Sequence, residues 1–220
     1  MAHKPRKRFG QNFLVDEQVI NQIVSTISPK RSDNVIEIGP GKGALTFPLI
    51  NHLEKIHVIE IDRDLISLLQ KKNNKKISIH ESDALVFNFD QFKHNIRIVG
   101  NLPYNISSPL LFHLLNYRDN IIDMTFMLQK EVVDRIVAPP GSKVYGRISV
   151  IMQAFFDAEL VFMVPKESFD PQPKIESAIL YLKTKSKPLV QNSKPLEEIV
   201  KIAFSQRRKT LKNCLKSVLN

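Results

Sequence analysis

The chain has 220 residues, 43% of them hydrophobic, and a formal net charge of +10. This composition can bury one sizeable core, and no apolar run reaches the ~20 residues that a membrane-spanning helix needs. No apolar signal core follows the basic N-terminus, and the single cysteine, Cys214, allows neither an internal disulfide nor a zinc site. We therefore expect a cytoplasmic protein without a membrane segment.

The positive charge is concentrated at the two ends of the chain. Residues 1–10 carry four basic and no acidic side chains, and residues 183–220 carry ten basic and two acidic ones. Residues 11–182 carry 18 basic and 20 acidic side chains, so the body is close to neutral. Basic ends on such a body favour binding to the phosphates of a polyanion, with a solvated tail at each end as the alternative.

The predicted elements alternate between helix and strand, after a first amphipathic helix at about 16–28. Short β-branched strands are predicted at 34–39, 56–62, 77–80, 96–100 and 123–129, with helices at 43–54, 63–72 and 107–117 between them. A helical stretch at 146–156 and two late strands at 160–164 and 177–182 follow. Because the strands are apolar throughout, they predict a mostly parallel, doubly wound α/β sheet covered by helices on both faces.

The sequence changes character after Lys183. Residues 183–188 are polar and charged, as is typical of a linker, and residues 195–219 then give helical patterns. Pro195 suits the first turn of a helix. We therefore predict one domain at 1–183 and a second, helical part at 184–220.

Closely spaced glycines follow the first predicted strand directly, in Glu37-Ile-Gly-Pro-Gly-Lys-Gly43. Gly39 and Gly41 let the backbone turn sharply and approach a ligand without Cβ collisions. The spacing matches neither the phosphate-binding loop nor the full dinucleotide fingerprint. The loop indicates a small-molecule site, with a plain tight turn as the alternative.

Carboxylates follow the next two strands. Glu60 lies at the tip of the second strand, where an acid can accept hydrogen bonds from both ribose hydroxyls. Asp62 competes for this role, although Asp62 followed by Arg63 is more typical of a helix N-cap. Asp83, after the third strand, can accept from the exocyclic amine of an adenine. With the glycine loop at the same sheet edge, these acids resemble the S-adenosylmethionine (SAM) site of the Rossmann-like class I methyltransferases, whose sheet has seven strands.

The fourth strand ends in Asn101-Leu102-Pro103-Tyr104, whose residue types suit chemistry on an aromatic amine. The lone pair of adenine's exocyclic amine is delocalised into the ring, so two acceptors on its N–H bonds would localise that pair. The Asn101 side-chain oxygen and the Leu102 carbonyl can be these acceptors, with Pro103 fixing the backbone. Tyr104 offers a flat face to an extruded base. The alternative is a proline-terminated strand before an N-cap at Ser107.

Asn-Leu-Pro-Tyr at this position resembles the motif of the RNA adenine-N6,N6-dimethyltransferases, and the likeness covers most of the chain. Residues 7–14 are similar to that family's N-terminal cofactor-covering segment, which implies that Asn12 and Leu14, like Asn101, contact the cofactor. Residues 126–133, 145–149 and 169–177 are similar to the family too. The resemblance implies SAM as the cofactor, no metal, and Phe169 as a second aromatic face on the target adenine.

Two branches of this family compete. Residues 101–107 and 204–213 are more similar to the enzymes that modify two adjacent adenines in the 3′-terminal hairpin of small-subunit (16S) ribosomal RNA. The other branch modifies a large-subunit (23S) adenine and confers macrolide resistance. The resemblance implies the immature small ribosomal subunit as the partner of a monomer. It also implies that this chain holds a small, truncated C-terminal helical domain, because the family has a longer one.

The basic ends supply the residues that we expect to bind RNA. They are Arg6, Lys7, Arg8, Arg207, Arg208, Lys209 and Lys212. The density of cations at 207–212 favours phosphate contacts over packing against a neighbour, with a solvated helix face as the alternative. A non-catalytic RNA-binding or assembly factor with the same fold is the rival function, and the glycine spacing disfavours a nicotinamide-dependent dehydrogenase.

Overall fold

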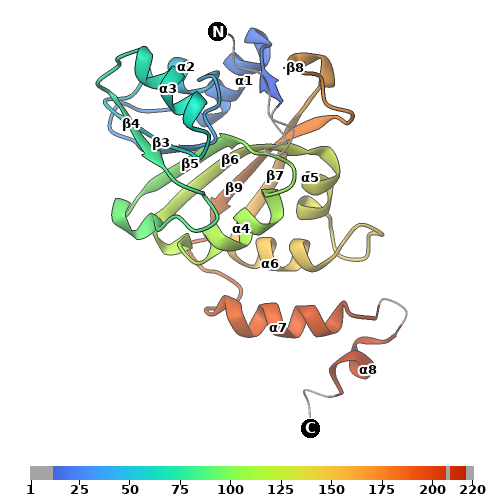
Figure 1. The fold of residues 1–220 in the computed structure, drawn as a ribbon. Coiled ribbons are helices and arrows are strands. Elements are labelled where there is room, and N and C mark those ends of the chain that lie inside the picture. Colours follow the sequence, from blue (N-terminus) through green and yellow to red (C-terminus); the bar gives the residue numbers. More distant parts are fainter. Residues whose placement is uncertain (1–11, 207–208, 217–220) are drawn as a thin grey trace.

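A seven-stranded, mostly parallel sheet forms the centre of the computed structural model, which describes residues 12–206 and 209–216 (Figure 1). Its strand order is β4-β3-β2-β5-β6-β9-β7. The strands are β2 Asn34–Ile38, β3 Ile56–Glu60, β4 Ile77–Glu81, β5 Ile96–Asn101, β6 Ile121–Gln129, β7 Phe156–Val164 and β9 Ser177–Thr184. Strands β2 to β6 run parallel, and β9 lies antiparallel between β6 and β7. The predicted doubly wound sheet is confirmed.

Helices cover both faces of this sheet. They are α1 Glu17–Ile27, α2 Thr46–Ile50, α3 Arg63–Lys71, α4 Ser107–Leu115, α5 Lys130–Val137 and α6 Arg147–Phe155. Alternate residues of β2 separate two apolar clusters: Val35 packs with α1 to α3, and Ile36 packs with α4 to α6. Burial on both faces explains why the central strands are mostly apolar, whereas the edge strands β4 and β7 are partly exposed.

Three predicted boundaries were wrong. The helix expected at 43–54 is only Thr46–Ile50, because the backbone still turns at Gly43, where φ is +89°. Strand β7 begins at Phe156 rather than 160, directly after α6. The helical patterns at 195–219 form two helices, α7 Ser193–Ala203 and α8 Leu211–Leu215, with a break between them. Pro195 lies in the first turn of α7, as expected.

The C-terminal part begins where the sheet ends, since β9 stops at Thr184. Helix α7 packs against α6, and Val200 is 5% exposed in the core cluster of the α4–α6 face. Figure 1 shows α7 below α6 with α8 beyond it. The division at 184 stays a prediction.

An ion-pair network ties the amino ends of the strands together. The Arg97 guanidinium, near the start of β5, donates to Asp33 at 2.7 Å, to Asp123 at 2.9 Å and to the carbonyl of Ile27 at 2.8 Å. The Arg97 side chain is 13% exposed. Burial opposes its charge, but the hydrogen bonds that Arg97 donates to both carboxylates outweigh burial, so the pKa of Arg97 is raised. The network satisfies buried charges at the amino ends of the strands.

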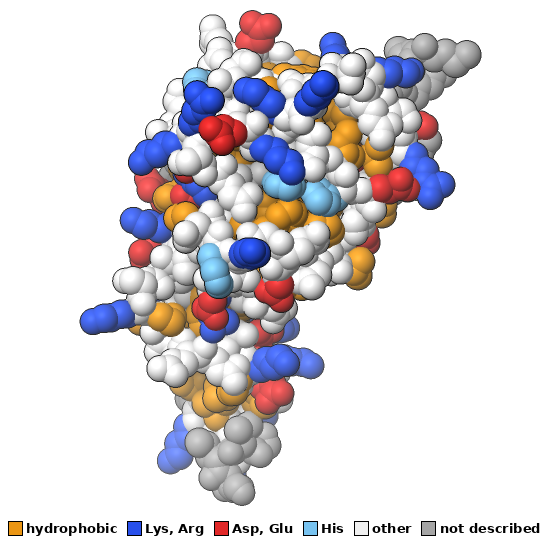
Figure 2. All heavy atoms as spheres, turned by 90° about the vertical axis from the view of Figure 1, so that its left-hand side faces the viewer, with side chains coloured by type: hydrophobic (Ala, Val, Ile, Leu, Met, Phe, Trp, Pro, Cys, Tyr) orange, Lys and Arg blue, Asp and Glu red, His pale blue; other side chains and the backbone are white. Residues whose placement is uncertain are grey.

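A histidine pair lies at the β4 edge of the sheet. His57 Nδ1 and His80 Nε2 are 3.0 Å apart, and the Phe92 ring centroid is 4.7 Å from that of His57. Burial lowers the pKa of His57 to about 4, so its ring is neutral at physiological pH. On this edge, Figure 2 shows histidine side chains beside an apolar patch, with basic and acidic side chains scattered around them. Within the described ranges, no group of three or more His, Cys, Asp or Glu side chains could hold a metal ion.

Candidate active site

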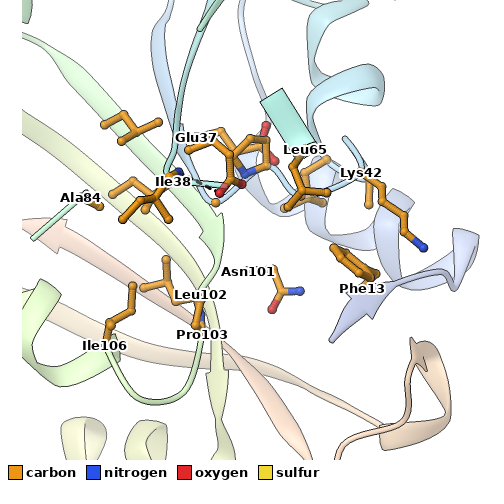
Figure 3. A pocket seen from close by; sticks show the side chains of 18 of the residues that line it. Phe13, Glu37, Ile38, Lys42, Leu65, Ala84, Asn101, Leu102, Pro103 and Ile106 are labelled. Carbon is orange, nitrogen blue, oxygen red and sulfur yellow. Dashed lines mark hydrogen bonds between the residues drawn. The ribbon is translucent and has the colours of Figure 1, made fainter. Parts of the chain in front are cut away.

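A cavity of about 230 Å³ opens at the carboxyl ends of β2, β3 and β5 (Figure 3). Carboxyl ends of parallel strands are where open α/β sheets bind ligands. The residues predicted for cofactor and catalysis that line it are Asn12, Leu14, Gly39, Gly41, Glu60, Asp83, Asn101, Leu102, Pro103 and Tyr104. The structure therefore brings together every residue of that predicted set except Phe169.

The glycine loop forms one wall of the cavity. Gly39 and Gly41 have φ of +67° and +57°, in the left-handed region that disfavours side chains. A Cβ on Gly41 would lie 3.2 Å from a ring atom of Phe13. Gly39 N–H donates to the Ile59 carbonyl at 3.0 Å, which ties the loop to the end of β3. The loop is thus more than a tight turn, because its backbone lies close to the end of β3 and to the Phe13 ring.

Glu60 and Asp83 are held by backbone amides at the cavity wall. Glu60 Oε1 accepts from Ile61 N–H and Asp62 N–H, each at 2.9 Å, which fixes the direction of the carboxylate. Burial raises the pKa of Glu60, and these backbone hydrogen bonds partly oppose that rise. Asp83 Oδ1 accepts from Leu85 N–H at 2.9 Å. The competing candidate Asp62 instead caps α3, since its carboxylate accepts from Asp64 N–H at 3.1 Å.

Glu37 is a site residue that the sequence analysis did not single out. It points into the cavity from β2, is 1% exposed, and accepts from Thr46 Oγ1 at 2.5 Å (Figure 3). Burial raises the pKa of Glu37 to about 7, and the hydrogen bond from Thr46 opposes that rise. The available signal was an acid within a buried apolar strand, which needs a partner or a ligand.

The Asn101 amide is oriented by the N-terminal segment. Asn101 Nδ2 donates to the Asn12 carbonyl at 3.0 Å, and a carbonyl can only accept, so the assignment of nitrogen and oxygen is settled. The amide oxygen therefore points the other way, toward the side of Leu102 and Pro103 (Figure 3). Leu102 N–H donates to the Met127 carbonyl at 3.1 Å and fixes the following turn on β6.

Tyr104 is held in place at its hydroxyl. Its oxygen lies 3.0 Å from Ser177 Oγ at the start of β9, and burial raises the pKa of this phenol. Ser107, the alternative N-cap, does not cap α4, because that position is Ile106. Ser107 Oγ instead donates to the Pro103 carbonyl at 3.1 Å. The loop is therefore anchored by β9 and by the first turn of α4.

Two short strands lie at this edge of the sheet, and only the first of them lines the cavity. Their residues show no periodic pattern in the sequence. β1 Phe13–Leu14 pairs antiparallel with β8 Phe169–Asp170. Phe13 lines the cavity, and Lys42 Nζ lies 4.4 Å from its ring centroid. Phe169 is 5% exposed, packs in the apolar cluster of the α1–α3 face, and does not line the cavity.

The residues present fit an adenosyl cofactor. The glycine backbone offers a concave wall that a Cβ at Gly41 would narrow, and Glu60 and Asp83 are hydrogen-bond acceptors suited to ribose hydroxyls and an exocyclic amine. Ile61, Leu65 and Ala84 give the same cavity an apolar surface suited to a purine.

The predicted RNA-binding residues are only partly described. Lys209 and Lys212 are exposed, at the break before α8 and within it. Arg6, Lys7, Arg8, Arg207 and Arg208 lie outside the described residues. Along the described chain, no helix combines the length and apolar character needed to cross a membrane.

The strand order, the single reversed strand and the cavity at the carboxyl edge define the class I methyltransferase fold. A family model described as ribosomal RNA adenine dimethylase matches residues 2–220. The chain belongs to the ribosomal RNA adenine dimethylase family, and it is a methyltransferase.

Known proteins of this kind match nearly the whole chain. A relative from Nitrosospira multiformis named Ribosomal RNA small subunit methyltransferase A is 52% identical over 222 residues, which cover 100% of this chain and 86% of the relative. The crystal structure of a dimethyladenosine transferase from Plasmodium falciparum gives a TM-score of 0.85 at 32% identity, covering 93% of this chain and 74% of that one. The 23S rRNA methyltransferase ErmE gives 0.78 at 28% identity, covering 94% and 84%.

Proposed function

We propose that this chain dimethylates N6 of two adjacent adenines in the 3′-terminal hairpin of small-subunit ribosomal RNA, with SAM as the methyl donor. The observation that carries the proposal is the oriented amide of Asn101, whose nitrogen is fixed by the Asn12 carbonyl. Support for the small subunit comes from the name of the relative that is 52% identical. We expect the chain to act as a cytoplasmic monomer on the immature subunit.

The catalytic loop positions and activates the target amine. Asn101 Oδ1 and the Leu102 carbonyl accept its two N–H bonds, which draws the nitrogen toward tetrahedral geometry and localises its lone pair. Pro103 holds the Leu102 carbonyl in its direction, because proline restricts the residue before it. The chain must then align the amine with the methyl group. Such alignment can supply a large part of the rate enhancement.

Aromatic faces hold the extruded base. Tyr104 stacks on it, and the hydrogen bond between Tyr104 and Ser177 keeps the ring at one angle. Phe169 belongs to the β1–β8 pair and is buried in the apolar cluster of the α1–α3 face, so its predicted role as a second face requires that pair to shift when RNA binds. Tyr104 is therefore the aromatic face that can contact the extruded adenine before any such shift.

The chain also holds the methyl donor. SAM supplies a methyl group on a sulfonium, an electrophile that needs no metal. Gly39 and Gly41 let the backbone approach it, Glu60 accepts from the ribose hydroxyls and Asp83 from the adenine amine. Asn12, Leu14 and Asn101 close the cavity over it. The RNA itself is bound at its phosphates by Arg6, Lys7, Arg8, Arg207, Arg208, Lys209 and Lys212.

The test is methylation of unmodified small ribosomal subunits by the full chain with isotopically labelled SAM. We expect label in N6,N6-dimethyladenosine at two adjacent positions, identified by mass spectrometry of digested RNA. Large subunits in a parallel reaction are expected to stay unlabelled. Label only in large-subunit RNA would favour the macrolide-resistance reaction, and tight subunit binding without label would favour a non-catalytic assembly factor.

A further inference from the structure

A second hollow, of about 480 Å³, lies between α4, α5 and the loop that leads into α6. We call it the α4–α6 groove. Its lining includes Ser108, Phe112, Arg135, Lys143, Arg147 and Phe204, none of which lines the cofactor cavity. It joins segments that resemble the family but have no role in the cofactor site, residues 145–149 and the start of 204–213. Figure 1 shows α4 and α6 on the same face of the sheet, with α7 below α6.

The charge of the groove suits a phosphate. Three of its lining residues are cations, and among the described residues no Asp or Glu lines it. Arg147 is exposed and has no ion-pair partner within the described chain. Arg135 pairs with Glu131 one turn earlier on α5, but both side chains are more than half exposed. Such an exposed pair is weak, so a phosphate can replace the carboxylate.

The start of α6 slightly disfavours the charge of Arg147 in the absence of an anion. Arg147 is the first residue of α6, where the positive end of the helix dipole disfavours a cation. A phosphate bound by Arg147 would reverse the sign of that interaction.

Hydrogen bonds between side chains and the backbone fix the helices that border the groove. Gly146 N–H donates to Ser149 Oγ at 2.9 Å, and Ser149 Oγ donates to the Arg135 carbonyl at 2.5 Å. Gln153 Nε2 adds hydrogen bonds to the carbonyls of Ile136 and Ala138. These bonds lock the start of α6 onto the end of α5, so Arg135 and Arg147 project from fixed positions.

Aromatic rings form the apolar part of the groove. Phe112 and Phe204 are partly exposed, and the ring centroid of Tyr145 lies 6.3 Å from that of Phe204. Partly exposed rings beside cations are the combination that binds single-stranded nucleic acid, with bases stacked and phosphates paired.

The groove lies next to the catalytic loop. Ile106 lines the cofactor cavity and Ser108 lines the groove, so at most about 7 Å of backbone separates their Cα atoms. We propose that the α4–α6 groove is a second RNA subsite that binds the nucleotide next to the flipped adenine. Arg135 and Arg147 bind its phosphate, and Phe204 contacts its base. This inference rests on the proposed function and adds a specificity element to it.

The experiment compares Arg147→Gln with Arg31→Gln in the full chain. Both changes remove an exposed arginine charge, but Arg31 pairs with Glu54 and lies outside the groove. The probe is a transcript of the 3′-terminal small-subunit hairpin, titrated at several salt concentrations. For Arg147→Gln we expect about fivefold to twentyfold weaker binding and a salt slope smaller by about 0.7. Cofactor affinity and melting temperature should not fall.

Two further variants separate the parts of the proposal. Arg147→Lys should restore most of the affinity, because it keeps the charge. Phe204→Leu should weaken binding several-fold with an unchanged salt slope, because stacking releases no counterions. If Arg147→Gln and Arg31→Gln give the same affinity and slope, the groove binds no phosphate and the inference is wrong. Methylation of small ribosomal subunits by the wild-type chain with labelled SAM would show that the proposed function survives that result.

Discussion

The two ends of the central sheet use polar residues in opposite ways. At the amino ends, Arg97 joins Asp33 and Asp123, and the polar groups bind one another. At the carboxyl ends, Glu60 and Asn101 are oriented by backbone groups and border a cavity. Side chains that pair with one another stabilise the fold. Side chains that are oriented by backbone hydrogen bonds keep oxygen atoms free to accept from a ligand. Polar residues at the amino ends of the strands therefore stabilise the fold, and those at the carboxyl ends are available to bind a ligand.

The largest stability effect should come from breaking the amino-end network. Arg97→Met leaves two carboxylates without their buried partner, which costs about 3–5 kcal/mol of unfolding free energy. Chemical denaturation measures this loss. Below its lowered melting temperature, the variant should keep the cofactor affinity of the wild type, because Arg97 does not line the cavity.

Arg31→Met is the matched control for that experiment. Its ion pair with Glu54 is exposed, with side-chain exposures of 84% and 66%, so its loss should change stability very little. Equal losses for the two variants would contradict the distinction between a buried network and a surface pair.

The buried acid of the cofactor cavity should make stability depend on pH. The pKa of Glu37 is about 7 in the folded chain against an ordinary value of 4.5, so the folded state holds its proton longer. The stabilisation is fully present below pH 4.5 and is lost as pH rises to about 7, in total about 3 kcal/mol.

Glu37→Gln should remove this pH dependence. We expect the difference in unfolding free energy between wild type and variant to change across the window from pH 4.5 to 7 and to stay constant above it. The exposed Glu159→Gln serves as control. A wild-type profile parallel to that of Glu37→Gln would exclude a raised pKa for this carboxyl.

A smaller effect is expected for a side chain added to the glycine loop, and a second glycine serves as the control for backbone strain. Gly41→Ala and Gly141→Ala both place a side chain at positive φ, which costs about 1–2 kcal/mol. Only the Gly41 position has a neighbour, the Phe13 ring at 3.2 Å, whereas nothing lies within 4 Å of a Cβ on Gly141. Calorimetry should show weaker SAM binding for Gly41→Ala alone. Similar SAM affinities in both variants would remove the glycine loop from the cofactor site.

The smallest effect concerns the hydroxyl of Tyr104. Tyr104→Phe keeps the ring and removes the hydrogen bond to Ser177, so we expect a loss of RNA methylation rate of only a few-fold. Tyr104→Ala removes the stacking face, which is worth about 1–3 kcal/mol per base. A larger loss in the Phe variant than in the Ala variant would show that the hydroxyl, not the ring, is the functional group.

The sequence predicts the sheet well because short runs rich in β-branched, apolar residues favour buried strands over helices or loops. It also predicts Gly39, Glu60, Asp83 and Asn101 as one site, since strand ends of a parallel sheet share an edge. The length of α2 was not predictable from apolar periodicity, because three glycines at positive φ hold the backbone in turns until Gly43.

Other features depend on contacts between distant residues. The β1–β8 pair has two residues in each strand, too few for any periodicity, and it joins residues 13–14 to 169–170. For the same reason, the sequence does not indicate Phe13 as a site residue. The Arg97 network was equally hidden, because its acids are distant in sequence and one precedes its strand. The burial of Phe169 follows from the same long-range pairing.

The most direct test of the site is the Asn101→Ala variant. Removing the amide oxygen should lower the single-turnover rate of adenine methylation by at least about 100-fold, as loss of a preorganised polar contact does elsewhere. Calorimetry with SAM and thermal melting should show a cofactor affinity within tenfold of wild type and an intact fold. A methylation rate within tenfold of the wild type would contradict the account, since the oriented Asn101 oxygen would then not act on the amine.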